Sequence, residues 1–241
     1  MAPGAREASE ATGPSRVPLV LAAVLTAGTG AADAISFLRL GNVFTSMMTG
    51  NLIQVGVAVG RGDAALAAHV MVAVVAFVAG VLASSRIVGP AAQGLPLWPR
   101  RVSVALAGEL VALSCFLGAW AAAGGRPGGG EQLALLAVLA LAMGMQSGAV
   151  RGIGIPNLST TYLTGTLIGV LATAATTGRV QWQNLMLLAA LLAGASAGGV
   201  LIVLAPAAAP ALPVGLLVLV LMAAQTSARN GRFRQARRQR P

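Results

Sequence analysis

Long apolar runs with almost no charge inside them constrain the fold of this chain more than any other feature. A helix needs about 20 residues to cross the 30 Å hydrocarbon core of a bilayer. Only 9% of the 241 residues are charged, whereas a soluble domain carries about 25%, so there are too few polar side chains to cover a globule. The sequence therefore predicts an all-α fold, a polytopic transmembrane helical bundle of six to eight membrane segments. Eight such segments can be drawn, at residues 17–38, 43–60, 65–88, 102–123, 131–150, 158–177, 185–205 and 212–228.

Two topologies are open, because segments 43–60 and 158–177 each begin with a polar cluster. If all eight segments cross and both ends are cytoplasmic, eleven Arg lie inside and five outside. If these two segments dip into the membrane and return, the counts become thirteen and three. Cytoplasmic loops carry an excess of basic residues, which favours the second topology. In both topologies the N- and C-termini are cytoplasmic.

An internal duplication is indicated when Thr49-Gly50 is aligned with Thr164-Gly165, an offset of 115 residues. The same offset also aligns Asn42 with Asn157, Thr45 with Thr160, Ser46 with Thr161, Leu52 with Leu167, and Ile53 with Ile168. The alternative is that small and polar residues recur in all membrane helices. The predicted regions are a disordered leader at 1–16, a first repeat of membrane helices at 17–123, a second at 131–228, and an Arg-rich cytoplasmic tail at 229–241.

The basic residues favour a membrane surface over nucleic acid as partner. All sixteen are Arg, typical of a GC-rich bacterial genome, and the largest cluster follows the last apolar segment. Such a juxtamembrane cluster marks a cytoplasmic flank attracted to anionic lipid. We therefore expect a multi-pass protein of the bacterial plasma (inner) membrane that binds the lipid bilayer and no nucleic acid, with its oligomeric state open.

No residue pattern indicates catalysis or a metal. Cys115 is alone and cannot form an internal disulfide, and His69 has no second ligand at metal-binding spacing. Motifs for nucleotide binding, zinc hydrolysis and serine hydrolysis are absent. We expect neither a cofactor nor enzymatic activity.

Polar residues within the apolar segments are the candidates for a substrate path. A charge deep in hydrocarbon faces the protein interior, a partner or water, so Asp33, Arg86, Glu109 and Arg151 are notable. For Asp33 the alternatives are an ion pair with Arg39 or Arg151, or simple snorkelling to the interface. The segments that contain Thr49-Gly50 and Thr164-Gly165 (the Thr-Gly segments) suit interrupted helices, which offer backbone groups and hydroxyls to a small polar solute or ion. The alternative is that their hydroxyls bond back to their own helix. The candidates are Asp33, Asn42, Thr45, Thr49, Gly50, Asn51, Gln146, Arg151, Asn157, Thr160, Thr164, Gly165 and Thr166.

Two strings carry a family resemblance. DAISFLRLGNVFTSMMTGNLIQVGVA, at 33–58, and MGMQSGAVRGIGIPNLSTTYLTGTLIGVL, at 143–171, resemble the two signatures of the YoaK-like bacterial membrane family, a domain of unknown function. The similarity extends over roughly residues 18–226 and implies a multispanning inner-membrane protein without an established substrate. The second signature often has Asn at Ser147 and Asp at Asn157. The residues at recurrent family positions are Asp33, Thr49, Gly50, Asn51, Gln146, Arg151, Pro156, Thr164, Gly165 and Thr166.

Two functions follow from these patterns. The first is a small-solute or ion transporter or channel whose paired Thr-Gly segments line the path. The second is a non-transporting membrane scaffold or partner subunit, in which the same motifs serve only helix packing.

Overall fold

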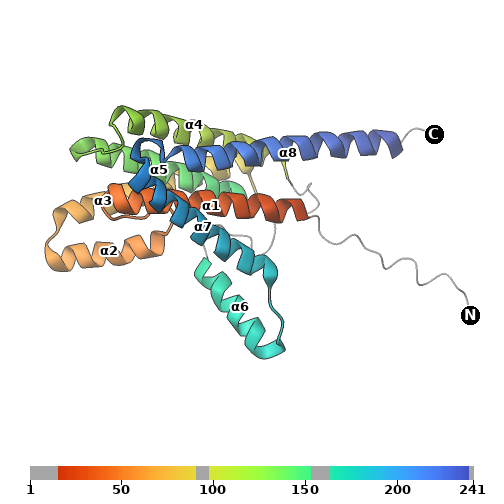
Figure 1. Cartoon of the computed structure of the whole chain (residues 1–241), viewed down its shortest axis with the longest axis horizontal. Helices are drawn as coiled ribbons and strands as arrows, with labels where there is room; N and C mark the ends of the chain where they lie inside the picture. The colour runs from red at the N-terminus through yellow and green to blue at the C-terminus, as the bar shows by residue number, and fades with distance from the viewer. Residues whose placement is uncertain (1–15, 91–97, 153–162, 239–241) are drawn as a thin grey trace, which may run out of the picture.

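The computed structural model describes residues 16–90, 98–152 and 163–238, and all of its regular elements in these ranges are helices. Six of the helices are long and apolar enough to cross a membrane. They are α1 (Arg16–Arg39), α3 (Ala64–Val88), α4 (Arg100–Ala122), α5 (Gly129–Arg151), α7 (Trp182–Leu204) and α8 (Ala211–Arg238), whose apolar part with the preceding turn runs from Pro206 to Thr226. Figure 1 shows these helices packed side by side, with the Arg16 end of α1 and the Arg238 end of α8 at the same end of the bundle.

The other two α-helices are shorter than a membrane span within the described residues. α2 (Met48–Arg61) has 14 residues and α6 (Leu163–Thr177) has 15, so each is only about 21–23 Å long at 1.5 Å per residue. They correspond to the two segments that the sequence singled out as polar at their starts. If these six helices cross and the two short ones do not, the sequence has thirteen Arg on the side of the termini and three on the other, which is the topology that the distribution of Arg favours.

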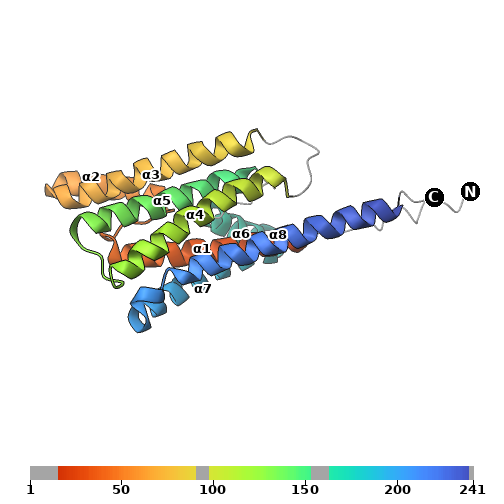
Figure 2. The same ribbon diagram turned by 90° about the horizontal axis from the view of Figure 1, so that it is seen from above.

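α2 forms a tight hairpin with α3 at one end of the bundle (Figure 2). Gly62 ends α2 with a φ of 64°, in the left-handed region that glycine adopts without strain. The side chain of Asp63 then caps α3 by accepting a hydrogen bond of 3.0 Å from the backbone N–H of Leu66. α6 lies beside α7 in the same way and away from α3 and α5 (Figure 1).

α1 and α5 are the central helices. Two thirds of the apolar window of each is buried, compared with 17% for α3 and 22% for α7. The peripheral helices present large apolar side chains outward, as at Val203, which is 77% exposed. A soluble monomer rarely exposes contiguous apolar surface on this scale, whereas lipid covers it in a bilayer.

Glycines allow α1 and α7 to touch backbone to backbone. A Cβ atom added at Gly194 would overlap the carbonyl oxygen of Ala27, and one added at Gly30 would overlap that of Leu191. Gly198, one turn after Gly194, lies against the backbone of Ala31. This is the small-xxx-small packing that drives helix association where lipid removes the hydrophobic driving force.

α3 and α5 form a second seam of the same kind. A Cβ atom at Gly80 would overlap the carbonyl oxygen of Leu141, and one at Gly144 would overlap that of Phe77. Gly148 lies against the hydroxyl oxygen of Ser84. Each half of the chain thus supplies one central helix that packs against a peripheral helix of the other half, an arrangement consistent with the predicted duplication, which itself stays a prediction.

Where the structure describes them, the predicted segments agree with the helices to within a few residues, except at the start of segment 43–60 and at the end of segment 212–228. Residues 158–162 of the sixth segment lie outside the described residues. Segment 43–60 was expected to begin at Val43, but α2 begins at Met48 because the residues before it fold as a loop. The α8 helix continues through Arg238, and the Arg-rich cytoplasmic tail at 229–241 stays a prediction.

Candidate functional site

The chain between α1 and α2 turns back along the last turns of α1, and Asp33 holds it there. One carboxylate oxygen of Asp33 accepts hydrogen bonds from the backbone N–H of Thr45 at 2.7 Å, from the Thr45 hydroxyl at 2.9 Å and from the backbone N–H of Ser46 at 2.9 Å. The other oxygen accepts from the hydroxyl of Ser46. All three side chains are buried, so non-helical backbone lies inside the bundle with the N–H groups of Thr45 and Ser46 hydrogen-bonded to Asp33.

Two further side chains fasten the same loop. The hydroxyl of Ser36 donates to the carbonyl of Val43 at 2.7 Å. The Asn51 amide nitrogen donates to the carbonyl of Phe44 at 2.6 Å, while its oxygen accepts from the Phe44 N–H at 3.1 Å. Asn51 therefore pairs with a loop residue as a neighbouring β-strand would, which satisfies both of its buried polar ends.

The carboxylate at position 33 lies about 9 Å from the end of α1, six residues before Arg39. The loop that it binds therefore re-enters the bundle to roughly that depth before α2 leads out again. We name this unit the α1–α2 latch: Asp33, Ser36, the loop 40–47 and Asn51. Irregular backbone at membrane depth occurs only where it is buried in protein or lines a cavity.

The latch brings together some of the predicted path residues and leaves others outside. Asp33, Thr45 and Asn51 meet in it. Asn42 lies on the exposed side of the loop with a φ of 59°, and its carbonyl accepts a bond of 3.0 Å from the Gln54 side chain. Thr49 is exposed and Gly50 half-buried in the first turn of α2, so neither contacts Asp33.

In the second half, Thr164 and Gly165 are exposed and Thr166 is half-buried in the first turn of α6. Asn157 and Thr160 lie outside the described residues. Whether a latch forms in this half is therefore not described, and the matched pairs of polar residues stay a prediction there.

The two arginines proposed as partners of Asp33 do not pair with it. Asp33 is satisfied by four hydrogen bonds from the loop. Arg151 is exposed at the end of α5, and Arg39 is half-exposed at the end of α1. Within the described residues, Asp33 anchors the loop and forms no ion pair.

Gln146 ties α5 to α1. Its amide nitrogen donates to the Thr29 hydroxyl at 2.7 Å and lies 3.4 Å from the carbonyl oxygen of Leu25. Thr29 in turn donates to that same carbonyl at 3.1 Å. These buried bonds between helices are of the kind that specify packing in membranes.

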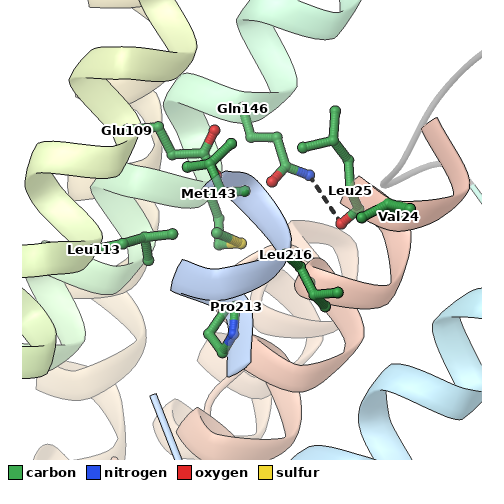
Figure 3. Close-up of a pocket in the computed structure, with 10 residues that line it drawn as sticks. Val24, Leu25, Glu109, Leu113, Met143, Gln146, Pro213 and Leu216 are labelled. Carbon is green, nitrogen blue, oxygen red and sulfur yellow. Dashed lines mark hydrogen bonds between the residues drawn. The ribbon is translucent and has the colours of Figure 1, made fainter. Parts of the chain in front are cut away.

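Glu109 is a charged residue of an apolar segment that is not among the predicted path residues. Its side chain is fully buried, and neither carboxyl oxygen has a hydrogen-bond partner among the described residues. It lines a pocket where α1, α4, α5 and α8 meet, and the space is too small to hold a water molecule. Figure 3 shows the carboxyl of Glu109 above Met143. The amide nitrogen of Gln146 points away from Glu109, toward the carbonyl of Leu25. The remaining lining residues are apolar.

His69 has a structural environment. Its Nδ1 lies 2.8 Å from the carbonyl of Ala65 and its Nε2 3.3 Å from the side-chain oxygen of Gln132. Gln132 donates to the carbonyl of Arg39 at 2.6 Å. The described residues contain no group of three or more His, Cys, Asp or Glu side chains that is able to hold a metal ion.

Apolar helices of spanning length, closed by glycine seams around buried polar groups, define a multispanning transmembrane protein. The chain belongs to the family described as "Protein of unknown function (DUF1275)", whose model matches residues 21–223. It is also 34% identical over 156 residues to the UPF0700 transmembrane protein YoaK of Bacillus subtilis (strain 168), covering 63% of this chain and 64% of that protein. The match thus spans just under two thirds of the relative's length. No solved structure matches the chain.

Proposed function

We propose that this protein is a transporter or channel for a small polar solute or ion, without enzymatic activity. The observation that carries the proposal is the α1–α2 latch, which holds non-helical backbone and the hydroxyls of Thr45 and Ser46 inside the bundle. Interrupted helices of this kind supply the backbone and hydroxyl groups that bind solutes in membrane transporters. The predicted duplication supports the same class, because three crossing helices in each half would give the two halves opposite orientations, as in many transporters.

The proposed orientation places both termini in the cytoplasm of a bacterial inner membrane. Thirteen of the sixteen Arg then lie on the cytoplasmic side, as the positive-inside rule requires. The Arg-rich end of the chain would bind anionic lipid at that surface.

The scaffold alternative has one observation in its favour. The hydrogen-bonding groups of Asp33, Thr45 and Asn51 are used within the latch, so the motif also suits a purely structural role. Under this alternative, loosening the latch lowers stability and there is no flux to lose.

Flux measurements on purified protein in liposomes separate the two functions. The probes are alkali cations, halide and phosphate anions, amino acids and small organic cations. Their flux is measured electrically and with radiotracers. We expect at least one probe to move, and its flux to fall at least tenfold in Thr45→Val. Thr176→Val is the matched control, because Thr176 is exposed on α6 and bonds only its own helix at Ala172.

Flux that is identical to empty liposomes for every probe class would contradict the transport proposal. If Thr45→Val and the Thr176→Val control instead retain equal flux, the path does not use the latch. A lower melting temperature of Thr45→Val without flux in the wild type would favour the scaffold alternative.

A further inference from the structure

Glu109 is a buried acid that the latch does not use, and we propose that it is a proton-binding site at the centre of the bundle. Its role in coupling proton movement to transport rests on the proposed function; the binding of the proton does not. The site lies on α4, at the tenth of 23 residues, about 14 Å from the start of that helix. This depth is near the middle of the hydrocarbon core.

The surroundings of the carboxyl allow only its neutral form. The side chain is 0% exposed, and in the part of the chain that the structure describes both oxygens lack a hydrogen-bond donor. The described residues that line the pocket include no arginine or histidine. An ionised carboxylate without a partner in such a place costs far more free energy than a neutral acid. A bound proton therefore neutralises the charge that no side chain of the pocket neutralises.

A metal cation does not fit the same pocket. Hard cations such as Ca²⁺ require about six to eight oxygen ligands, and the pocket offers Glu109 and the amide of Gln146 among apolar side chains. The space also excludes water that would complete a coordination shell. The proton is the one cation that needs no further ligands.

The position of the pocket makes the proton exchangeable if the bundle opens. Val24 and Leu25 line it from α1, while Met143 and Gln146 line it from α5. These helices belong to different glycine seams. Gln146 ties them beside the pocket by its hydrogen bond to Thr29, and Gln132 ties them farther along by its bond to the carbonyl of Arg39. A separation of the two seams therefore brings water to Glu109 and lets the acid ionise, whereas closure requires its proton back.

Infrared spectroscopy of the full chain in lipid tests the protonation directly. A neutral carboxylic acid has a carbonyl stretch above the amide I band that a carboxylate lacks. At neutral pH we expect this band in the wild type and its loss in Glu109→Gln. The matched control is Glu131→Gln, which changes an exposed glutamate in the first turn of α5 and leaves the band in place. If Glu109→Gln does not fold, ¹³C-glutamate labelling of the wild type shifts the band instead and separates it from any Asp33 contribution.

Transfer to D₂O tests the coupling role. We expect the Glu109 band to shift as the proton exchanges, which shows that the pocket opens to water. Absence of the band at neutral pH overturns the proton site. A band that never shifts in D₂O overturns coupling and leaves a fixed neutral acid. A band that is present and exchanges, in a protein that moves no solute, retains the proton site and contradicts the transport proposal alone.

Discussion

Gly194→Ala is the most direct test of the seam between α1 and α7. The new methyl group would overlap the carbonyl oxygen of Ala27, and backbone atoms have no alternative rotamer to relieve the overlap. The two helices must then separate along the seam, which also loosens the contact of Gly198 with Ala31. Gly199→Ala is the matched control on the same helix, because a Cβ atom there meets nothing within 4 Å.

The pair of variants isolates the steric effect. Both gain the higher helix propensity of Ala, about 1 kcal/mol relative to Gly, so this contribution cancels in their difference. Overpacking of a close contact costs about 1–3 kcal/mol, and this is the expected difference in the free energy of unfolding. At roughly 2–4 °C per kcal/mol for a chain of this size, Gly194→Ala melts about 2–12 °C below Gly199→Ala.

Thermal unfolding in detergent measures this difference through the fluorescence of the three tryptophans. Equal melting temperatures for the two variants would refute the backbone contact between α1 and α7. A Gly199→Ala variant that is the less stable of the two would refute the assignment of which face of α7 is buried.

The other predictions concern buried polar groups. Asp33→Ala leaves two backbone amides and two hydroxyls of the latch without an acceptor and destabilises the protein by about 3–6 kcal/mol. Its control, Asp63→Ala, removes one helix cap and costs about 1 kcal/mol. Comparable melting temperatures for the two variants would contradict the latch. Asn51→Leu removes both bonds to the loop backbone and costs about 2–4 kcal/mol, with faster amide exchange over 40–47 as the specific sign. Trp120→Phe leaves the carbonyl of Pro206 without its donor at 2.8 Å and lowers stability by about 1–2 kcal/mol, and an unchanged melting temperature would show that this bond is dispensable.

The crossing helices were predictable from the sequence because bilayer thickness fixes their length. α3 was expected at 65–88 and runs from Ala64 to Val88, since nothing inside this apolar run favours another structure. The start of α2 was not predictable in the same way. Val43 and Phe44 look like the first residues of a membrane helix, but hydrogen bonds to Ser36 and Asn51 hold them in a loop.

The candidate site was predictable only in part. Asp33 and Thr45 were among the predicted path residues because polar residues cluster there in the sequence, and the structure brings them together in one local motif; their role in a path stays a prediction. Glu109 was noted as a charge near the start of its segment, but its importance depends on which helices surround it. The absence of a donor arises from four helices far apart in the sequence, and no local pattern contains that information.

The two seams also have consequences for how the protein is made. The partner of α3 is α5, which follows after a single intervening long helix, whereas α1 pairs with α7. During synthesis the groove around Gly30 must therefore face lipid, or an insertion factor, until almost the whole polypeptide has entered the membrane. The latch needs no such wait, because all of its hydrogen bonds join residues within 13 positions of one another. During biogenesis the α1–α2 latch would thus form early and the contact between α1 and α7 would form last. A chain truncated before Trp182 would leave α1 without α7 to pack against.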